Sequence, residues 1–260
     1  MSSVSISIVL YNNTAKTVNS LVKNVEKSTK NLVDVQLFLV NNSPENEDLT
    51  AYLQTFKSTD WIKIIVPETN GGFGAGNNLV LPYLQSDYHI VMNPDIMISS
   101  EHELDKMINY LEENPRVGLL SPLIKFPNGE VQHLLKRKSS VLDMAIRFLR
   151  LPGTERRKAW FVNLPDGYSH THKAENVPGS FLVFRTSIFE KIGGFDEKYF
   201  LYMEDCDITM KVNQVSNAVF FPEAFVYHEW QRENRKSIKG IYHMLSSMFV
   251  YFNKWGWKLY

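Results

Sequence analysis

Two acidic segments, far apart in the chain, carry the side chains best suited to chemistry. The first is Asn93-Pro94-Asp95, which directly follows the apolar stretch 88–92. The second is Glu204-Asp205-Cys206-Asp207, with three carboxylates within four residues. Such carboxylates repel one another unless a cation, helix N-terminal amides or a substrate hydroxyl compensates. Asp95 is therefore either a turn residue after proline or a functional acid, and the acidic run either complements a helix dipole or lines a site.

A segment rich in glycine and asparagine, residues 70–78, precedes Asp95 and contains four glycines and three asparagines. Its backbone can approach a ligand closely, and the asparagines favour a polar ligand over a purely structural turn. It is not a dinucleotide fingerprint, because it lacks the third glycine of G-x-G-x-x-G and follows the third predicted strand instead of the first. A P-loop is excluded by the absence of Gly-Lys-Ser/Thr.

His228 follows an apolar stretch near the end of the chain. A lone histidine after a strand is usually structural, and it becomes a candidate metal ligand only with an oxygen partner such as Asp95. His170 and His172 have weaker claims, because they lie in a variable part of the sequence.

The composition excludes several classes of function. Lys+Arg and Asp+Glu balance at 28 each in 260 residues, so the chain has no net positive charge that would attract it to nucleic acid. The single cysteine, Cys206, excludes an internal disulfide and a cysteine-based zinc site. The apolar run 4–10 lacks the basic flank of a secretory signal, and no run approaches the ~20 apolar residues of a membrane-spanning helix. We expect a cytoplasmic protein that is at most attached to the inner face of the cell membrane.

Strands that alternate with amphipathic helices are expected to position these residues. Helical apolar stripes begin at Val18, Leu49 and Leu104, and Leu79, Val80 and Leu84 predict a further helix. The alternation implies a mostly parallel sheet, which binds ligands beyond the carboxyl ends of its strands, where Asp95 lies. Strands are predicted at 5–10, 33–40, 62–66, 88–92, 117–120, 180–185 and 218–221.

Three segments of the second half depart from this rhythm. Pro127-Asn128-Gly129 predicts a hairpin between 123–126 and 131–135. Residues 136–175 are basic and irregular, which indicates a mobile lobe or lid. The segment 232–260 mixes basic and aromatic residues in a pattern that suits the surface of an anionic bilayer, although core packing or a homodimer contact explains it equally.

The order of these motifs resembles the family 2 inverting glycosyltransferases, which have the α/β GT-A fold. In that fold a mostly parallel central sheet is flanked by helices and has a small antiparallel part on the acceptor side. The resemblance covers roughly residues 4–230 and is greatest to bacterial rhamnosyltransferases that use dTDP-L-rhamnose. It is carried by the motifs IVLYNN, VNNS, TNGGFGAGNN, MNPD, PGSFLVFR and GGFDEKYFLYMEDCDITMK, together with the late histidine.

The resemblance implies a division of the chain and of the chemistry. A GT-A domain over 1–230 would have a nucleotide-sugar half, 1–95, and an acceptor half, 96–230, that contains the variable lobe 136–175; an amphipathic helical extension, 231–260, follows. Asp95 and His228 would hold Mg²⁺ or Mn²⁺ on the donor diphosphate, Asp205 would be the catalytic base, and Glu204 and Asp207 would position acceptor or loop. Ser237 is an alternative contact to the diphosphate. The donor, dTDP- or UDP-linked, would contact Tyr11, Asn41, Asn70, Gly72, Phe73, Gly74, Asn77, Asn93 and Asp95.

Two departures from the family pattern bear on these roles. Asn93 replaces the first acid of the common Asp-x-Asp, so the metal has one protein carboxylate, and Asn41-Asn42 replaces the common Asp-Asn near the pyrimidine. The expected product is a cell-surface polysaccharide, built by transfer to a saccharide or lipid-linked saccharide acceptor.

Three alternatives remain open from the sequence. UDP-galactofuranose or another UDP-hexose is the alternative donor. A sugar-phosphate nucleotidyltransferase would need a basic glycine-rich loop near the N-terminus, where this chain has Tyr11-Asn12-Asn13-Thr14. A non-catalytic saccharide-binding module would need neither Asp95 nor Asp205.

Overall fold

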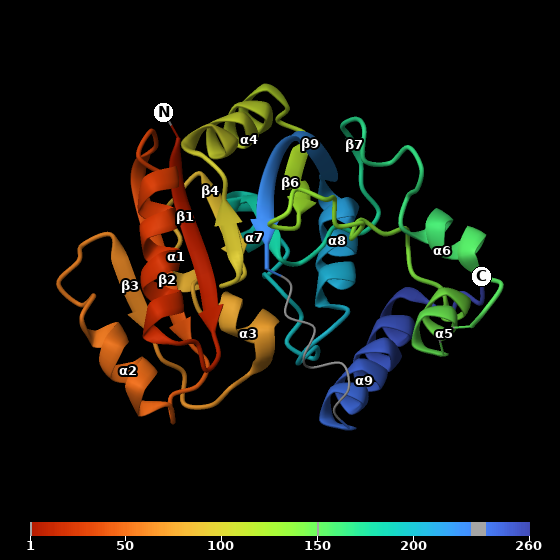
Figure 1. Ribbon diagram of the computed structural model, residues 1–260, viewed down its shortest axis with the longest axis horizontal. Coiled ribbons are helices and arrows are strands. Elements are labelled where there is room, and N and C mark those ends of the chain that lie inside the picture. Colours follow the sequence, from red (N-terminus) through yellow and green to blue (C-terminus); the bar gives the residue numbers. More distant parts are fainter. Residues whose placement is uncertain (1, 150, 230–237) are drawn as a thin grey trace.

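The computed structural model describes residues 2–149, 151–229 and 238–260. Within these residues one nine-stranded sheet runs through the molecule, and helices lie against it (Figure 1). The strand order is β3-β2-β1-β4-β8-β6-β9-β5, and β7 pairs with β9 outside this path. The strands are β1 Ser3–Leu10, β2 Val33–Asn41, β3 Ile62–Ile65, β4 Tyr88–Met92, β5 Ile96–Ile98, β6 Val117–Lys125, β7 His172–Lys173, β8 Phe181–Arg185 and β9 Asn217–His228.

The N-terminal half is the predicted parallel sheet. Strands β3, β2, β1 and β4 are parallel neighbours, connected through α1 Ala15–Ser28, α2 Glu47–Gln54 and α3 Gly72–Asn78. The glycine-rich segment, predicted to be a loop, is mostly the helix α3. The helix expected from Leu79 to Leu84 is only a 3₁₀ turn, Leu81–Tyr83, because Pro82 has no N–H to extend a helix and disfavours helical backbone before it.

The C-terminal half is mixed. β8 is antiparallel to β4 and β6, β9 is parallel to β6, and β5 and β7 are antiparallel to β9. The predicted turn at 127–129 is present, and the Phe126 N–H donates to the Glu130 carbonyl while the Gln132 N–H donates to the Ile124 carbonyl. The second arm of this hairpin is short and pairs with the end of β6 through an antiparallel bridge between Lys125 and Val131. β9 does not end before Pro222 as predicted, since a register shift opposite Pro122 and Leu123 accommodates the proline within the strand.

Residues 136–175 contain two helices, α5 Val141–Leu149 and α6 Glu155–Phe161, in place of the predicted irregular lobe. The buried Asp143 carboxylate joins them, because it accepts hydrogen bonds from Arg157 Nε at 2.6 Å and Nη2 at 2.9 Å. Ser140 Oγ donates to the same carboxylate at 2.6 Å. A charged group this buried is stable only with such partners, so it fixes how the two helices pack.

Helix α9, Ile238–Trp255, packs against α8, Glu204–Val215. Its Tyr251 and Phe252 form a cluster with Tyr199, Met203 and Cys206. In Figure 1 α5, α6, α9 and the C-terminus gather at the end of the molecule opposite α2 and β3. Core packing, one of the explanations offered for 232–260, therefore holds for one face of α9. No helix in the described ranges has the length and apolarity needed to cross a membrane.

The sheet separates two main apolar clusters, and β4 contributes to both. Tyr88, Ile90 and Met92 belong to one cluster, which also contains residues of α1 and α4 (Glu101–Glu113), and Val91 belongs to the other, beside α7 (Thr186–Lys191). The side chains of β4 thus alternate between the two clusters. Because β4 is buried on both faces, its carboxyl end holds Asn93-Pro94-Asp95 in a fixed position.

Candidate active site

Asp95 and His228 lie side by side, although 132 residues separate them in sequence. The antiparallel ladder of β5 and β9 pairs Ile96 with His228, and the Glu229 N–H donates to the Asp95 carbonyl. Asp95 Oδ2 is 3.3 Å from His228 Nε2. The histidine, which needed an oxygen partner to count as a ligand candidate, therefore has the predicted one.

The Asp95–His228 pair fits a divalent cation that is also bound by a substrate. Asp95 Oδ1 is buried and has no hydrogen-bond partner in the structure, so one carboxylate oxygen remains available. No group of three or more His, Cys, Asp or Glu side chains in the described residues could hold a metal by itself. Mg²⁺ typically takes one or two carboxylates and completes its coordination with phosphate oxygens and water, which matches this small donor set.

The glycines of α3 are explained by packing within the protein. Gly72 has φ +91°, and a Cβ there would lie 2.1 Å from the Phe200 carbonyl oxygen. A Cβ on Gly74 would contact Phe195 at 2.9 Å, and one on Gly76 would contact Val9 at the same distance. Gly72 and Gly74 thus allow α3 to pack closely against the loop before α8, and Gly76 allows it to pack against β1.

The residues predicted to contact the donor fall into two groups. Asn41 and Asn77 are fully buried, and their amides bond within the protein, Asn41 to Thr50 and Ser43 and Asn77 to Ser7 and Phe73. In this structure both amides position the scaffold, and their contact with a donor stays a prediction.

The remaining predicted donor contacts lie near the carboxyl edge of the sheet. Tyr11 follows β1 and is 55% exposed. Asn70 accepts from the Gly72 N–H and from Asn42 Nδ2, so it shapes the start of α3. Phe73 and Asn93 line the cavity described next, and Gly72 and Gly74 are buried.

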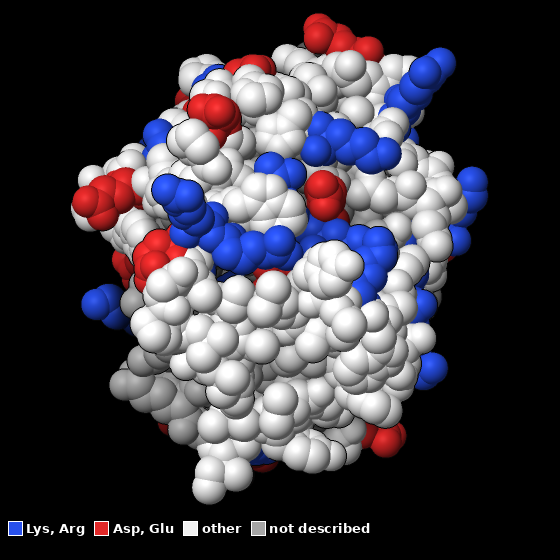
Figure 2. All heavy atoms as spheres, turned by 90° about the vertical axis from the view of Figure 1, so that its right-hand side faces the viewer, with Lys and Arg blue, Asp and Glu red and all other residues white. Residues whose placement is uncertain are grey.

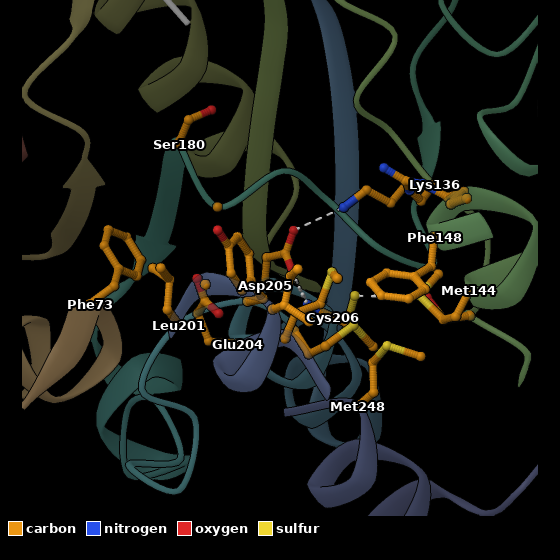
Figure 3. A pocket seen from close by; sticks show the side chains of 18 of the residues that line it. Phe73, Lys136, Met144, Phe148, Ser180, Leu201, Glu204, Asp205, Cys206 and Met248 are labelled. Carbon is orange, nitrogen blue, oxygen red and sulfur yellow. Dashed lines mark hydrogen bonds and ion pairs between the residues drawn. The ribbon is translucent and has the colours of Figure 1, made fainter. Parts of the chain in front are cut away.

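One cavity of about 610 Å³ connects the two halves of the chain. Asn93 reaches it from the end of β4, and Glu204 and Asp205 reach it from the start of α8 (Figure 3). Its walls differ in character: Asp205 faces Lys136, whereas Met144, Phe148 and Met248 lie together on the side of α5 and α9. The other lining residues are Phe73, Ser139, Arg147, Gly179, Ser180, Leu201, Tyr202, Met203, Cys206, Gly240, Ile241 and Met244.

A strained turn presents the two acids. Tyr202 and Met203, which precede Glu204, have φ +70° and +66°, a left-handed conformation that costs roughly 1–3 kcal/mol per non-glycine residue. Gly179 makes room for them, because a Cβ there would lie 3.2 Å from Asp205 Cβ. The acidic run does begin a helix, yet Glu204 and Asp205 face a cavity, so complementing the helix dipole does not account for them alone.

The environments of the two acids differ. Burial, followed by the neighbouring Asp205 charge, raises the pKa of Glu204 to about 8. Burial also acts to raise the pKa of Asp205, but Lys136, at 3.2 Å, and the Cys206 N–H outweigh it and hold the pKa below its usual value. At neutral pH Asp205 is therefore the carboxylate and Glu204 is mostly the neutral acid.

Three buried oxygens without protein partners occur at this site: Asp95 Oδ1, Ser180 Oγ and Glu204 Oε2. Ser180 also lies next to Asn93, since its carbonyl accepts from the Asn93 N–H. Ser180 and Glu204 line the cavity, and Asp95 lies two residues beyond Asn93, which also lines it. Buried polar atoms are rarely left unpaired, so these oxygens indicate the position of a polar ligand.

Sequence reasoning missed several residues of the site. Ser180 appeared only inside a strand motif, Lys136 only in a basic run, and Gln132 only in a predicted hairpin. Asp207, expected to position acceptor or loop, is fully buried and accepts from Tyr199, Lys254 and Trp255, so it anchors α9. Ser237, the alternative diphosphate contact, lies outside the described residues.

Comparisons with known proteins agree with this architecture. The profile of glycosyl transferase family 2 matches residues 5–193. N-acetylglucosaminyl-diphospho-decaprenol L-rhamnosyltransferase of Mycobacterium tuberculosis is 26% identical over 223 residues, which are 75% of this chain and 66% of that protein. Rhamnosyltransferase WbbL of Escherichia coli is 28% identical over 173 residues, 63% of each chain. This chain thus spans just under two thirds of the length of these relatives.

Solved structures show the same fold. GalNAc-T7, crystallised with UDP, GalNAc and Mn²⁺, superposes with a TM-score of 0.67 at 17% identity over 90% of this chain and 44% of its own. The mannosyltransferase PcManGT of Pyrobaculum calidifontis, in complex with GDP-Man and Mn²⁺, has a TM-score of 0.59 at 12% identity over 89% of this chain and 58% of its own. With its GT-A fold and a family profile that matches well over half of its residues, the chain belongs to glycosyl transferase family 2.

Proposed function

We propose that this chain is an inverting glycosyltransferase that transfers L-rhamnose from dTDP-rhamnose to a saccharide or lipid-linked saccharide acceptor in cell-surface polysaccharide synthesis. One observation carries the proposal: Asn93, from the Asn-Pro-Asp segment, and the Glu204-Asp205 pair line the same cavity. With the donor diphosphate held at Asp95 and the acceptor hydroxyl at Asp205, the anomeric carbon of the donor would lie between them, within reach of the hydroxyl. Family membership supports glycosyl transfer as the reaction class.

The geometry supports a division of labour between the acids. Asp205 is ionised, so it can take the proton of the acceptor hydroxyl as that oxygen attacks the anomeric carbon. The bond from that carbon to the diphosphate oxygen breaks from the opposite side, and the configuration is inverted. Glu204, mostly protonated at neutral pH, can donate a hydrogen bond to the acceptor but is a poor proton acceptor.

Asp95 and His228 would hold a divalent cation, Mg²⁺ or Mn²⁺, on the donor diphosphate. Such a cation screens the negative charge of the diphosphate and improves it as a leaving group. The unpartnered Asp95 Oδ1 supports this role. Asn93, the substituted first acid, would contribute a neutral amide beside the donor sugar in place of a second charge.

The choice of rhamnose rests on the names of the relatives, two of which are rhamnosyltransferases. The Mycobacterium relative is named for a diphospho-decaprenol acceptor. A cavity wall of methionine and phenylalanine, with Lys136 and Arg147 also lining the cavity, suits a sugar linked through phosphate to an apolar chain.

The outer face of α9 supports contact with an anionic membrane. Ile238, Tyr242, Leu245 and Phe249 are exposed at helical spacing, although the opposite face of α9 is packed. Residues 238–260 contain three lysines and no acidic residue. Figure 2 shows a band of Lys and Arg across this end of the molecule, above a broad uncharged area. An apolar face bordered by cations is the pattern of helices that lie in a membrane interface.

A panel of nucleotide sugars, screened by thermal shift with and without Mn²⁺, tests the donor. A true donor raises the midpoint by mass action, and more so with the metal. We expect the largest shift with dTDP-rhamnose. A larger shift with UDP-galactofuranose or another UDP-hexose would replace the donor and keep the reaction class, whereas no shift with any nucleotide sugar would contradict the function.

A further inference from the structure

Gln132 holds both the main chain and the side chain of His228. Its side chain is almost fully buried between the end of β6 and the end of β9. Nε2 donates to the His228 carbonyl at 2.8 Å and lies 3.5 Å from the Lys125 carbonyl. Oε1 lies 3.0 Å from His228 Nδ1. The main chain of Gln132 is fixed as well, because its N–H donates to the Ile124 carbonyl at 2.9 Å.

These contacts determine where the proton sits on the imidazole. Both carbonyls near Nε2 can only accept, so the amide cannot be turned around without losing them. Oε1 must then face His228, and since a carboxamide oxygen can only accept, His228 Nδ1 must carry a proton. In the neutral ring the lone pair is therefore on Nε2, the nitrogen that lies 3.3 Å from Asp95 Oδ2.

A lone pair that faces a carboxylate oxygen is unfavourable unless a positive charge lies near both. We propose that Gln132 is a positioning residue for a divalent cation: it holds His228 as the Nδ1–H tautomer, so that Nε2 and the Asp95 carboxylate bind the same ion. The meaning of that ion for catalysis rests on the proposed function, whereas the tautomer does not.

Without Gln132 the ring would have a better alternative. The proton would move to Nε2 and be donated to Asp95 Oδ2, which lies within reach. That hydrogen bond would place a proton on Nε2, the nitrogen that would bind the ion, and so compete with the metal. Histidine ligands generally donate their second N–H to an oxygen, and loss of that partner typically lowers metal affinity about 10–100-fold.

Gln132 could instead serve only to hold β6 and β9 together through its hydrogen bonds. Variants separate this structural role from control of the His228 tautomer. Gln132→Met keeps the volume and removes every polar group. Gln132→Glu keeps an oxygen acceptor for Nδ1–H in either ionisation state. Asn24→Leu is the matched control, because Asn24 makes two amide hydrogen bonds to Ile98 of the neighbouring β5, each 2.9 Å, and does not touch His228.

Nitrogen-15 NMR of the ring reads the tautomer in the metal-free protein at about pH 8, where an ordinary imidazole is neutral. We expect Nδ1–H for His228 in the wild type, the Asn24→Leu variant and the Gln132→Glu variant, and Nε2–H in Gln132→Met. Mn²⁺ affinity in the presence of UDP, measured by electron paramagnetic resonance, should fall about 10–100-fold in Gln132→Met alone.

An Nε2–H signal in the wild type would overturn the proposal without any variant, so the test survives a Gln132→Met protein that does not fold. Equal losses of Mn²⁺ affinity in Gln132→Met and Gln132→Glu would also overturn it. They would show that Gln132 only holds the two strands together and does not set the tautomer of His228. If the tautomer changes as expected but no nucleotide sugar binds, the proposed donor fails and the role of Gln132 stands.

Discussion

At the scale of single residues, the unequal environments of Glu204 and Asp205 make opposite predictions for two isosteric changes. Asp205→Asn removes the only one of the two acids that is ionised at neutral pH, so kcat should fall about 10²–10⁴-fold while the donor Kd is unchanged. Glu204→Gln mimics the neutral form that Glu204 mostly has, so its effect on kcat should be small. Steady-state kinetics and donor titration of both variants check this. A loss in Glu204→Gln as large as in Asp205→Asn would make Glu204 the base.

The same scale shows where sequence reasoning reaches its limit. Asp95, His228 and the Glu204-Asp205 pair could be predicted from sequence, because carboxylates and histidines at strand ends and helix starts have only a few common roles. Asn41 and Asn77 are buried and hydrogen-bonded within the protein, which the sequence could not show, because a buried amide and a ligand-binding amide look identical in sequence. Gln132 and Ser180 were missed, because their roles depend on contacts with strands far away in the chain.

At the scale of elements, the close packing of α3 against the loop before α8 can be measured with two glycines of similar backbone conformation. Gly72 and Gly129 have φ of +91° and +89°, but a Cβ at Gly129 would meet nothing within 4 Å. Gly129→Ala should cost only the strain of left-handed backbone, about 1 kcal/mol, and Gly72→Ala should cost roughly 1–3 kcal/mol more. Urea unfolding of both variants measures the difference. Equal losses would mean that the contact with Phe200 contributes nothing.

A buried polar network joins β1, β4 and α3, and it predicts a dependence of stability on pH. His89 is fully buried and bonds to Ser5 and Ser7, and Ser7 donates to Asn77. Burial lowers the pKa of His89 to about 3, whereas the unfolded chain has the ordinary value of about 6.5. Below pH 6.5 the unfolded state binds a proton that the folded state does not, so the stability contributed by neutral His89 falls progressively toward pH 3.

The expected loss from His89 alone is about 2 kcal/mol at pH 5 relative to pH 7.5. His89→Gln removes the titrating group, so its unfolding free energy should fall less over the same interval, even if its stability at pH 7.5 is lower. Denaturant titrations at the two pH values give the comparison with the wild type. Parallel losses in the two proteins would show that His89 is not the titrating group.

At the scale of the whole molecule, the two halves of the sheet differed in how well sequence predicts them. In the parallel half β1 pairs with β2 and β2 with β3, each across one intervening helix, and β4 then pairs with β1. The alternation of strand and helix patterns was therefore sufficient to predict this part of the sheet. In the mixed half β8 pairs with β4 and β6 across segments that contain other helices and strands, and β5 was not predicted because three residues carry too little pattern. Local propensity cannot determine such pairings, since they depend on which distant strand has a free edge.

The two faces of α9 lead to the prediction that concerns the whole molecule. One face is fixed to α8 through Tyr251, Phe252 and the Asp207 anchor, so the exposed stripe cannot turn inward without breaking those contacts. The double variant Leu245→Ser with Phe249→Ser should therefore keep the fold and lose affinity for vesicles that contain anionic phospholipid. Burial of two large apolar side chains contributes about 3–6 kcal/mol, enough for a loss of 10²-fold or more.

Vesicle flotation at low and high salt measures this affinity, and Val66→Ser, which alters an exposed apolar residue beyond β3, is the control. Binding should require anionic lipid and weaken as salt is added, because the lysines of residues 238–260 contribute through their charge. The opposite outcome is a wild type that fails to bind vesicles and forms a dimer in light scattering that the double variant does not form. That result would show that the exposed stripe of α9 contacts a second copy of the chain. The membrane proposal would then fail, while the cavity would keep its role, because α5 and α9 line one of its walls with other residues.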